Sequence, residues 1–439
     1  MPAAPPPPFR RAVILAVGSE LLGIERLDTN SLAMTAALND CGIDLVWKAV
    51  AGDDAPSLAR AVRRAIDDAD LLLVCGGLGP TDDDLTRDVV ADVLGRPLRH
   101  DPAIEAAIEA RFAARGWVMA DNNRRQAQVP EGATVLPNAR GTAPGLWIDD
   151  GARGVLLLPG PPREMMPLLE QAVASFIAPR SGGRRIVRRM LRMTGRGEST
   201  IDALLQPSYR AWADGPVPVR ATILASMGQI ELHLSSVDAD PARAQAAVDA
   251  ACVTARAVIG RDVFSDDGSS LEAVVGHLLL ARGWTVAVGE SCTGGLVAER
   301  LTAVPGASRY FDQGVVTYSN AAKIGWLGVP EPLLAEHGAV SEPVARAMAA
   351  GVRGRTGADV GLGVTGIAGP GGGTPDKPVG TVAIAVALPP VAAGGDDADR
   401  GAGSAGVSSR VLRFSGDREQ IRFQSSQAVL DLLRRTLER

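Results

Sequence analysis

The sequence predicts an α/β protein of two or three domains, in which strands and helices alternate along most of the chain. Short apolar runs of the buried-strand type, such as VILAV at 13–17, recur between stretches whose apolar residues have helical spacing. The chain has 439 residues, too many for one hydrophobic core, and 46% of them are apolar, which is enough to fill several cores.

The first domain is expected over residues 11–180, as a three-layer domain with a mostly parallel sheet. Its βαβ order places helices on both faces, and ligands of such sheets bind at the carboxyl ends of the strands. The strand-like runs cover 13–17, 43–52, 71–77 and 154–160. The helical stretches cover 28–42, 56–69, 83–95 and 161–176. Residues 1–10, rich in proline and without an apolar segment, predict a disordered tail and no signal peptide.

Residues 184–262 predict a small α+β module. Strand-like runs at 184–195, 220–228 and 229–237 accompany helical stretches at 197–212 and 241–260. This module holds an arginine cluster, which favours a charged outer face over an RNA site because stacking aromatics are missing. The cluster comprises Arg184, Arg185, Arg188, Arg189, Arg192 and Arg196.

Residues 266–439 predict a further α/β domain. The strand-like runs cover 284–289, 359–366, 379–388 and 408–416, and 312–328 reads as strand, turn and helix. The helical stretches cover 270–283, 341–357 and 417–439. The low-complexity stretch 389–409 predicts a disordered insertion between the last two strands.

Charge and cysteine content exclude several function classes. The net charge is -5, which gives no general attraction to nucleic acid or anionic lipid, so direct nucleic-acid binding is not expected. No apolar run approaches the roughly 20 residues of a membrane helix. The four cysteines show no CxxC pairing and no metal-ligand spacing, which predicts free thiols in a soluble, cytoplasmic protein.

Lysine is rare enough to be informative. Only Lys48, Lys323 and Lys377 stand among the 45 basic residues. Arginine can replace lysine wherever a positive charge is sufficient, but its guanidinium cannot lose a proton at a useful pH. A lysine retained in this background is therefore a candidate for chemistry that needs a titrating amine.

Three motifs of the last domain could carry chemistry. GESCTGG (289–295) opens a helix, where free N–H groups could hold an oxyanion and either Ser291 or Cys292 could be the nucleophile; the plain alternative is a helix cap. YSNAAK (318–323) places Tyr318 at a strand end and Lys323 one helical turn on. No histidine lies near, so a Ser–Lys or Ser–Tyr–Lys arrangement is favoured. The glycine-rich segment 363–380 could approach a phosphate.

Three loops of the first domain predict a nucleotide pocket. GGLGPTDDDLT (76–86) follows a buried strand and offers successive carboxylates, which are ligands that Mg²⁺ prefers. VGSE with DTN (17–30) and LPGPPREM (158–165) lie at other strand ends of the same predicted sheet. The loops alone do not indicate which nucleotide binds.

Together these sequence motifs resemble the CinA family, the competence/damage-inducible proteins, over nearly the whole chain. VGSELL, GGLGPTDDDLT and LPGPPREM resemble the family's molybdopterin-binding-like domain. GESCTGG, YSNAAK, TGIAGPGG and GDREQIR resemble its nicotinamide-nucleotide amidohydrolase domain. The middle module is similar to a KH-like fold, and the resemblance also implies a homodimer.

The resemblance implies two sites. In the C-terminal domain, nicotinamide mononucleotide is hydrolysed to nicotinic acid mononucleotide and ammonia without a metal. The residues assigned to that site are Ser291, Tyr318 and Lys323 for catalysis, and Thr293, Gly294, Gly295, Asn320, Thr365, Gly366 and Gly369 for substrate binding. The N-terminal domain of some family members cleaves ADP-ribose with a divalent metal such as Mg²⁺, which the resemblance makes a possible second activity. The residues assigned there are Glu20, Asp28, Asn30, Gly76, Gly77, Thr81, Asp83, Asp84 and Glu164, with Asp83 and Asp84 as metal ligands.

The expected mechanism has Lys323 activate Ser291 as Tyr318 relays or orients the proton, while amides near Thr293–Gly295 hold the oxyanion. A water oriented without a covalent step is an equally economical version.

Two rival functions stay open: an ADP-ribose pyrophosphatase with a vestigial C-terminal domain, and a non-enzymatic pterin-binding or regulatory protein linked to competence and DNA damage.

Overall fold

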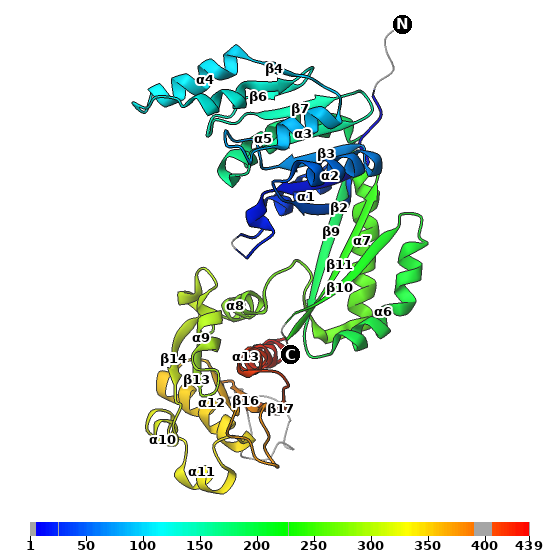
Figure 1. Cartoon of the computed structure of the whole chain (residues 1–439). Coiled ribbons are helices and arrows are strands. Elements are labelled where there is room, and N and C mark those ends of the chain that lie inside the picture. The colour runs from blue at the N-terminus through cyan, green and yellow to red at the C-terminus, as the bar shows by residue number, and fades with distance from the viewer. Residues whose placement is uncertain (1–5, 25, 227, 390–405, 439) are drawn as a thin grey trace. The chain divides into compact units, whose positions relative to one another are not determined.

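A computed structural model describes residues 6–24, 26–226, 228–389 and 406–438. The chain forms two compact units, Met1–Val187 with Ser236–Ala247 and Arg188–Ser235 with Val248–Arg439. The boundary runs through the predicted middle module, which is therefore shared between the units and lies mostly in the second. Figure 1 shows the helices and strands of each unit.

The sheet of the first unit has the order β2-β1-β3-β8-β7-β6. The strands β2, β1, β3 and β8 pair in parallel, as predicted, whereas β7 pairs antiparallel with both of its neighbours, β8 and β6. The prediction of a mostly parallel sheet thus holds for four strands. At this edge only four residues join β7 to β8, and so short a link closes an antiparallel hairpin. The sheet strands are Arg11–Val17 (β1), Asp44–Ala51 (β2), Leu71–Cys75 (β3), Thr134–Leu136 (β6), Gly145–Asp149 (β7) and Gly154–Leu158 (β8). A separate pair is Leu98–His100 (β4) and Gln128–Pro130 (β5).

Helices cover both faces of this sheet, which confirms the three-layer arrangement (Figure 1). One core joins α2, α3 and α4 to the sheet, and the other joins α1 and α5 to its opposite face. The helices are Asn30–Asp40 (α1), Ala55–Asp68 (α2), Thr86–Val93 (α3), Pro102–Ala113 (α4) and Pro162–Ala172 (α5).

The strand ends of the first unit meet where the loops were predicted to bind a ligand. Ala16 near the end of β1 lies opposite Cys75 at the end of β3. Gly76 follows with φ 107°, and a Cβ there would collide with the carbonyl oxygen of Val17. Glycine is therefore required for the chain to turn away at this point.

The prediction of a disordered tail over 1–10 is wrong at its end. Phe9 is fully buried, its ring packs edge-on against Trp147, and the guanidinium of Arg180 lies 3.8 Å from the ring centroid. Its N–H donates to the carbonyl of Arg180 at 2.8 Å. A single aromatic residue after a proline run gave no periodic signal, although its burial adds to the core. Residues 1–5 lie outside the described residues.

The middle segment forms a four-stranded sheet of order β10-β11-β9-β12 with two helices, which matches the predicted α+β pattern. Its elements are Arg185–Met193 (β9), Glu198–Ala213 (α6), Val219–Ser226 (β10), Gln229–Asp238 (β11), Pro241–Ile259 (α7) and Val263–Ser265 (β12). Three arginines of the basic cluster form ion pairs: Arg189 with Asp249, Arg192 with Glu231 and Arg196 with Asp262. This neutralisation supports a charged outer face; the KH likeness stays a prediction.

The C-terminal domain of the second unit is a five-stranded sheet of order β14-β13-β15-β16-β17 between helices. Parallel pairing joins β14, β13 and β15, and antiparallel pairing joins β16 and β17. The strands are Val286–Glu290 (β13), Phe311–Val316 (β14), Val360–Gly366 (β15), Thr381–Ala387 (β16) and Val407–Arg413 (β17). The helices are Leu271–Arg282 (α8), Leu296–Thr302 (α9), Asn320–Leu327 (α10), Glu331–His337 (α11), Glu342–Thr356 (α12) and Arg418–Leu437 (α13).

Two predictions for this domain need correction. The helix α11 was not predicted, because seven residues are too few for a periodic pattern to emerge. The insertion predicted over 389–409 is too long, since residues 407–409 already belong to β17 and pair with β16. Residues 390–405 lie outside the described residues.

Candidate active sites

Ser291 and Lys323 lie together in the C-terminal domain, although 32 residues separate them. Ser291 follows β13, and its N–H donates to the carbonyl of Val364 on the neighbouring strand. Lys323 lies in the first turn of α10, which Ser319 caps by accepting from the Ala322 N–H. The Nζ atom of Lys323 is 3.1 Å from Ser291 Oγ. The predicted dyad is therefore within hydrogen-bond distance.

The surroundings of Lys323 lower the pKa of its amine. Its side chain is 1% exposed, and burial is the main cause of the shift. Nζ donates to Ser291 Oγ and to the carbonyl oxygens of Thr317 and Tyr318, at 3.1, 2.9 and 3.4 Å. Once deprotonated, the amine can donate to the two carbonyls and accept from the hydroxyl. Among the described residues, no carboxylate forms an ion pair with Nζ that would hold the proton.

Cys292 is the alternative nucleophile that the sequence left open. The thiol is buried, and burial raises its pKa to about 12. Because the thiolate is the nucleophilic form, a thiol with this pKa is unreactive at neutral pH. Ser291 is therefore the better candidate.

Tyr318 and Asn320 lie beside the dyad but are not bonded to it. The side chain of Tyr318 is 59% exposed, and its hydroxyl accepts from Arg418 at 2.8 Å. In the described part of the chain no hydrogen bond joins this hydroxyl to Ser291 or Lys323, so the predicted proton relay is not formed here. Asn320 is exposed at the start of α10.

The turn 291–295 presents fewer free N–H groups than the sequence predicted. Thr293 is buried, and its hydroxyl has no hydrogen-bond partner among the described residues. The N–H of Gly294 donates to the carbonyl of Ser291, and that of Gly295 donates to the carboxylate of Glu290. The expected oxyanion donors at Gly294 and Gly295 are thus occupied. Sequence reasoning missed Glu290, whose position at the end of a buried strand was the available signal.

The glycine-rich segment continues from β15 at the sheet edge where Ser291 follows β13, but its predicted hydroxyl is already engaged. Thr365 Oγ1 donates to the carbonyl of Ala339 at 2.8 Å. A Cβ on Gly366 would come within 3.0 Å of Cys292 Sγ, so glycine allows this strand to pack against the nucleophile turn. Gly369 has φ 79°, and its carbonyl accepts from Arg418 at 2.8 Å.

Arg418 and Arg422, which the sequence motifs did not indicate individually, contact residues close to Ser291 and Lys323. Arg418 bonds both Tyr318 and Gly369, and Arg422 donates twice to the carbonyl of Thr293, at 2.7 and 3.2 Å. Both stand at the start of α13 and line a cavity of about 390 Å³ with Leu296, Glu419 and Phe423. Two guanidinium groups in one cavity form a candidate anion site.

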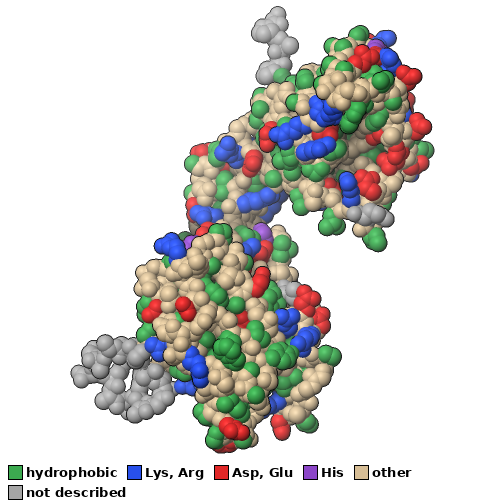
Figure 2. Space-filling model, turned by 90° about the vertical axis from the view of Figure 1, so that its left-hand side faces the viewer, with side chains coloured by type: hydrophobic (Ala, Val, Ile, Leu, Met, Phe, Trp, Pro, Cys, Tyr) green, Lys and Arg blue, Asp and Glu red, His purple; other side chains and the backbone are tan. Residues whose placement is uncertain are grey.

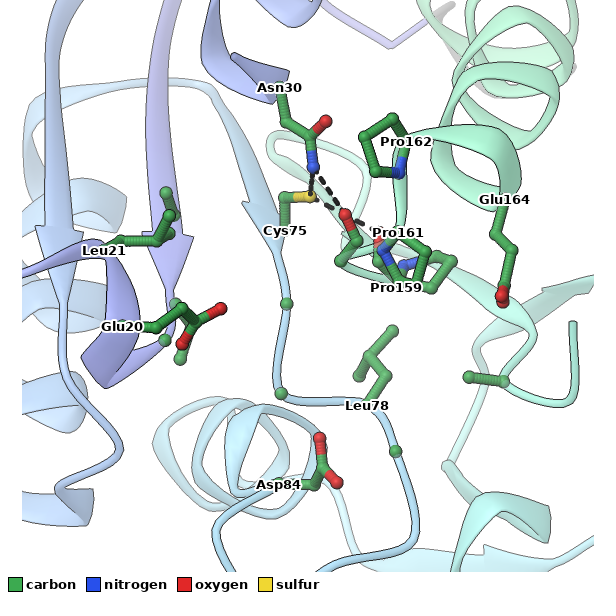
Figure 3. A pocket seen from close by; sticks show the side chains of 18 of the residues that line it. Glu20, Leu21, Asn30, Cys75, Leu78, Asp84, Pro159, Pro161, Pro162 and Glu164 are labelled. Carbon is green, nitrogen blue, oxygen red and sulfur yellow. Dashed lines mark hydrogen bonds between the residues drawn. The ribbon is translucent and has the colours of Figure 1, made fainter. Parts of the chain in front are cut away.

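The loops of the first unit form the second candidate site, a cavity of about 740 Å³ (Figure 3). Of the predicted residues, all but Thr81 line it: Glu20, Asp28, Asn30, Gly76, Gly77, Asp83, Asp84 and Glu164. Figure 3 shows Glu20, Asp84 and Glu164 on three different segments around the cavity. The loops predicted to meet at this sheet edge therefore do so.

Hydrogen bonds fix the walls of this cavity. The amide of Asn30 donates to the Gly160 carbonyl at 2.7 Å and to Cys75 Sγ at 3.2 Å, which joins α1 to the loop after β8 (Figure 3). Asp28 accepts from the Ser31 N–H at the start of α1. Burial raises the pKa of Cys75 to about 12, so this thiol is not reactive.

The predicted metal ligands are only partly available. Asp84 accepts from the N–H of Thr81 at 2.9 Å and from its hydroxyl at 2.5 Å, while Asp83 is exposed. Glu164 accepts from the amide of Asn138. Nowhere in the described ranges do three or more His, Cys, Asp or Glu side chains gather as a metal site. Asp83 and Asp84 stay predicted metal ligands, and we base no chemical step on a metal.

Comparison with known proteins covers both domains. Residues 268–437 match the family model described as the CinA C-terminal domain, and residues 13–179 match the probable molybdopterin binding domain. The chain is 47% identical to a putative competence-damage inducible protein of Symbiobacterium thermophilum over 97% of its own length and 98% of that protein. The chain belongs to the CinA family. A CinA-like protein of Koribacter versatilis is 46% identical over 97% of this chain and 99% of its own length.

Among solved structures, a CinA superfamily protein of Klebsiella pneumoniae is 35% identical over 38% of this chain and 96% of its own, with a TM-score of 0.34. In this CinA-family chain, acidic and basic side chains are interspersed over the face seen in Figure 2. No described helix is long and apolar enough to cross a membrane.

The remaining conspicuous lysine of the CinA domain has a structural role. Lys377 Nζ donates to the carbonyl of His337 at 2.7 Å, where α11 ends. Such a bond satisfies a free carbonyl at a helix C-terminus and does not need a titrating amine. Rarity of lysine alone was therefore no sufficient guide to chemistry.

Proposed function

We propose that the C-terminal domain hydrolyses the carboxamide of nicotinamide mononucleotide, releasing ammonia and nicotinic acid mononucleotide. The observation that carries this proposal is a buried lysine amine 3.1 Å from a serine hydroxyl, with no ion pair to a carboxylate among the described residues. An amine of lowered pKa next to a hydroxyl is an arrangement that activates serine for attack on an amide.

The reaction proceeds in two halves. Lys323 accepts the proton of Ser291 as Oγ bonds to the carboxamide carbon, and the protonated amine then donates to the departing nitrogen, which leaves as ammonia. Water, deprotonated by the same amine, hydrolyses the resulting ester and returns Ser291 with its proton. Direct attack by a water held between the two side chains gives the same products without the ester.

The neighbouring groups suit the two ends of the substrate. Arg418 and Arg422 would hold the 5′-phosphate, since guanidinium groups bind phosphate through paired N–H donors. The exposed ring of Tyr318 would lie against the pyridinium ring, whose positive charge is attracted to an aromatic face. The N–H groups of Cys292 and Thr293 would hold the oxyanion, because those of Gly294 and Gly295 already donate within the turn.

Ammonia release from nicotinamide mononucleotide, measured on the full chain with and without Mg²⁺, tests the proposal. We expect turnover that needs no added metal and that the Ser291→Ala variant loses. Hydroxylamine trapping of an ester on Ser291 distinguishes the covalent from the direct-water mechanism. Absence of ammonia from the wild-type chain across pH 6–10 would refute the proposed activity.

The cavity of the first unit supports a second proposal, a nucleotide-binding site for ADP-ribose or a related diphosphate. Its size and the convergence of three loops at the strand ends favour a nucleotide-sized ligand. Incubation with ADP-ribose, with and without Mg²⁺, followed by measurement of AMP tests cleavage. Binding of ADP-ribose or a pterin without turnover would instead favour the regulatory reading. A homodimer stays a prediction for light scattering to test.

A further inference from the structure

Glu290 is a buried acidic residue to which the proposed mechanism gives no part. Its side chain is 1% exposed, and among the described residues it forms no ion pair. One carboxylate oxygen accepts the N–H groups of Gly295 at 3.0 Å and Val297 at 3.1 Å, and the other accepts that of Ala298 at 2.9 Å. A buried carboxylate is costly unless several donors replace its hydration. The three N–H donors at the start of α9 replace the hydration of this carboxylate. The helix dipole also favours negative charge at that position.

The main chain of Glu290 connects through Thr317 to Lys323, the second residue of the dyad. Its carbonyl accepts the N–H of Thr317 at 2.7 Å, and the carbonyl of Thr317 accepts from Lys323 Nζ at 2.9 Å. One residue thus connects to both partners: its side chain closes the turn that carries Ser291, and its backbone holds the strand end that orients Lys323.

The same contacts decide which N–H groups remain for a substrate. At the start of α9 the donors of Gly295, Val297 and Ala298 are consumed by the carboxylate. At the start of α13, a capping box takes the N–H groups of Asp417 and Gln420. The start of α9 therefore does not offer these amides to a phosphate, and we assign anion binding to the guanidinium groups.

We propose that Glu290 is a positioning residue of the amidohydrolase site: its carboxylate fixes the turn 291–295 so that Ser291 Oγ stays within reach of Lys323 Nζ. This inference rests on the proposed function. Loss of the carboxylate should displace the hydroxyl, whereas Arg418 on α13 keeps its contacts to Tyr318 and Gly369, which lie outside the turn. A displacement of about 1 Å at a reacting group can lower a rate by about 10²-fold. Glu290→Gln should therefore lower kcat by about 10²-fold and change KM for nicotinamide mononucleotide by less than about threefold.

Asp359→Asn is the matched control. Its carboxylate accepts the N–H and hydroxyl of Thr285, just before β13, at the opposite end of that strand from Glu290. Both substitutions remove a carboxylate that accepts a backbone N–H, but only Glu290 contacts the nucleophile turn. Asp359→Asn should lose thermal stability and keep kcat within about threefold of wild type, because it leaves the turn unchanged.

A label on the serine gives a readout independent of the substrate. An aryl sulfonyl fluoride reacts as Ser291 Oγ bonds to sulfur, fluoride leaves and the hydroxyl proton passes to Lys323, and mass spectrometry measures the rate. We expect labelling about 10²-fold slower in Glu290→Gln and unchanged in Asp359→Asn. Glu290→Asp, which keeps the charge but is shorter by one methylene, should fall between wild type and Glu290→Gln, and serves where the amide variant does not fold.

The outcomes separate the two proposals. Labelling and kcat of folded Glu290 variants within threefold of wild type would overturn the positioning role while leaving the activity intact. A parallel loss of kcat in Asp359→Asn would overturn it too, by showing that any weakening of β13 suffices. A wild-type chain that takes the label but releases no ammonia would refute the substrate proposal alone. A wild-type chain inert to both would refute the dyad and, with it, this inference.

Discussion

Replacing Lys323 by arginine tests the titrating amine directly. Arginine keeps the positive charge and can still donate to the carbonyl oxygens of Thr317 and Tyr318, which lie 2.9 and 3.4 Å from Nζ in the wild-type protein. What it cannot do is release a proton and accept the one from Ser291, because a guanidinium stays charged in proteins. The substitution therefore removes the base and preserves much of the contact set.

The expected loss follows from the role of the amine. A positioned general base contributes about 10²–10⁴-fold to a rate. At about 1.36 kcal/mol for each tenfold change, Lys323→Arg should raise the activation barrier by about 2.7–5.4 kcal/mol. KM should change little, because the base contributes to the transition state and not to substrate binding.

The assay is initial-rate ammonia release at saturating nicotinamide mononucleotide, with thermal unfolding to check the fold. Lys377→Arg is the matched control, because Lys377 only donates to the His337 carbonyl and an arginine can do the same. That control should keep kcat within about threefold of wild type. A folded Lys323→Arg variant that retains more than a tenth of wild-type kcat would refute the assignment of Lys323 as the base.

Four further outcomes are expected. Cys292→Ala should keep kcat within about fivefold, since burial holds the thiol pKa at about 12 and leaves no thiolate to lose; a loss comparable to that expected for Lys323→Arg would contradict this. Arg418→Gln should raise KM at least about tenfold in steady-state kinetics, because phosphate contacts are lost. The control Arg413→Gln, at an exposed arginine outside that cavity, should leave KM unchanged. Phe9→Ala should cost about 3–5 kcal/mol in urea unfolding because the ring is fully buried, and a cost below about 1 kcal/mol would argue against its place in the core. Because burial lowers the pKa of Lys323, the unfolded chain binds more protons between that lowered value and the ordinary one, so the unfolding free energy should rise with pH across this window, and the rise should be absent in Lys323→Met.

The pattern of apolar residues predicted the elements that are long and those that are continuous apolar runs. The strands β1, β3 and β8 are continuous apolar runs, and helices such as α2 and α13 are long enough to repeat their spacing. It did not indicate the seven-residue α11, the antiparallel edge of the first sheet or Phe9. These features depend on pairing and packing across the sheet, which spacing along the chain does not encode.

The candidate site shows the same limit at the level of chemistry. A serine before two glycines and a rare lysine pointed to Ser291 and Lys323, and motif resemblance supplied a substrate. Glu290 and Arg418 escaped notice because acids at strand ends and arginines at helix starts are common. Their roles become visible only when three N–H groups are seen on one carboxylate and one guanidinium is seen between Tyr318 and Gly369.

By itself, the sequence determined the fold class, the order of most strands and helices, the loops that meet at each sheet edge and the two residues of the dyad. These follow from local periodicity and from the rule that parallel strands end at one edge. The tertiary structure alone decided which donors and acceptors are already taken. The occupied amides of Gly294 and Gly295, the engaged hydroxyl of Thr365 and the three hydrogen bonds of the Lys323 amine depend on how the chain folds, which spacing along the sequence does not encode.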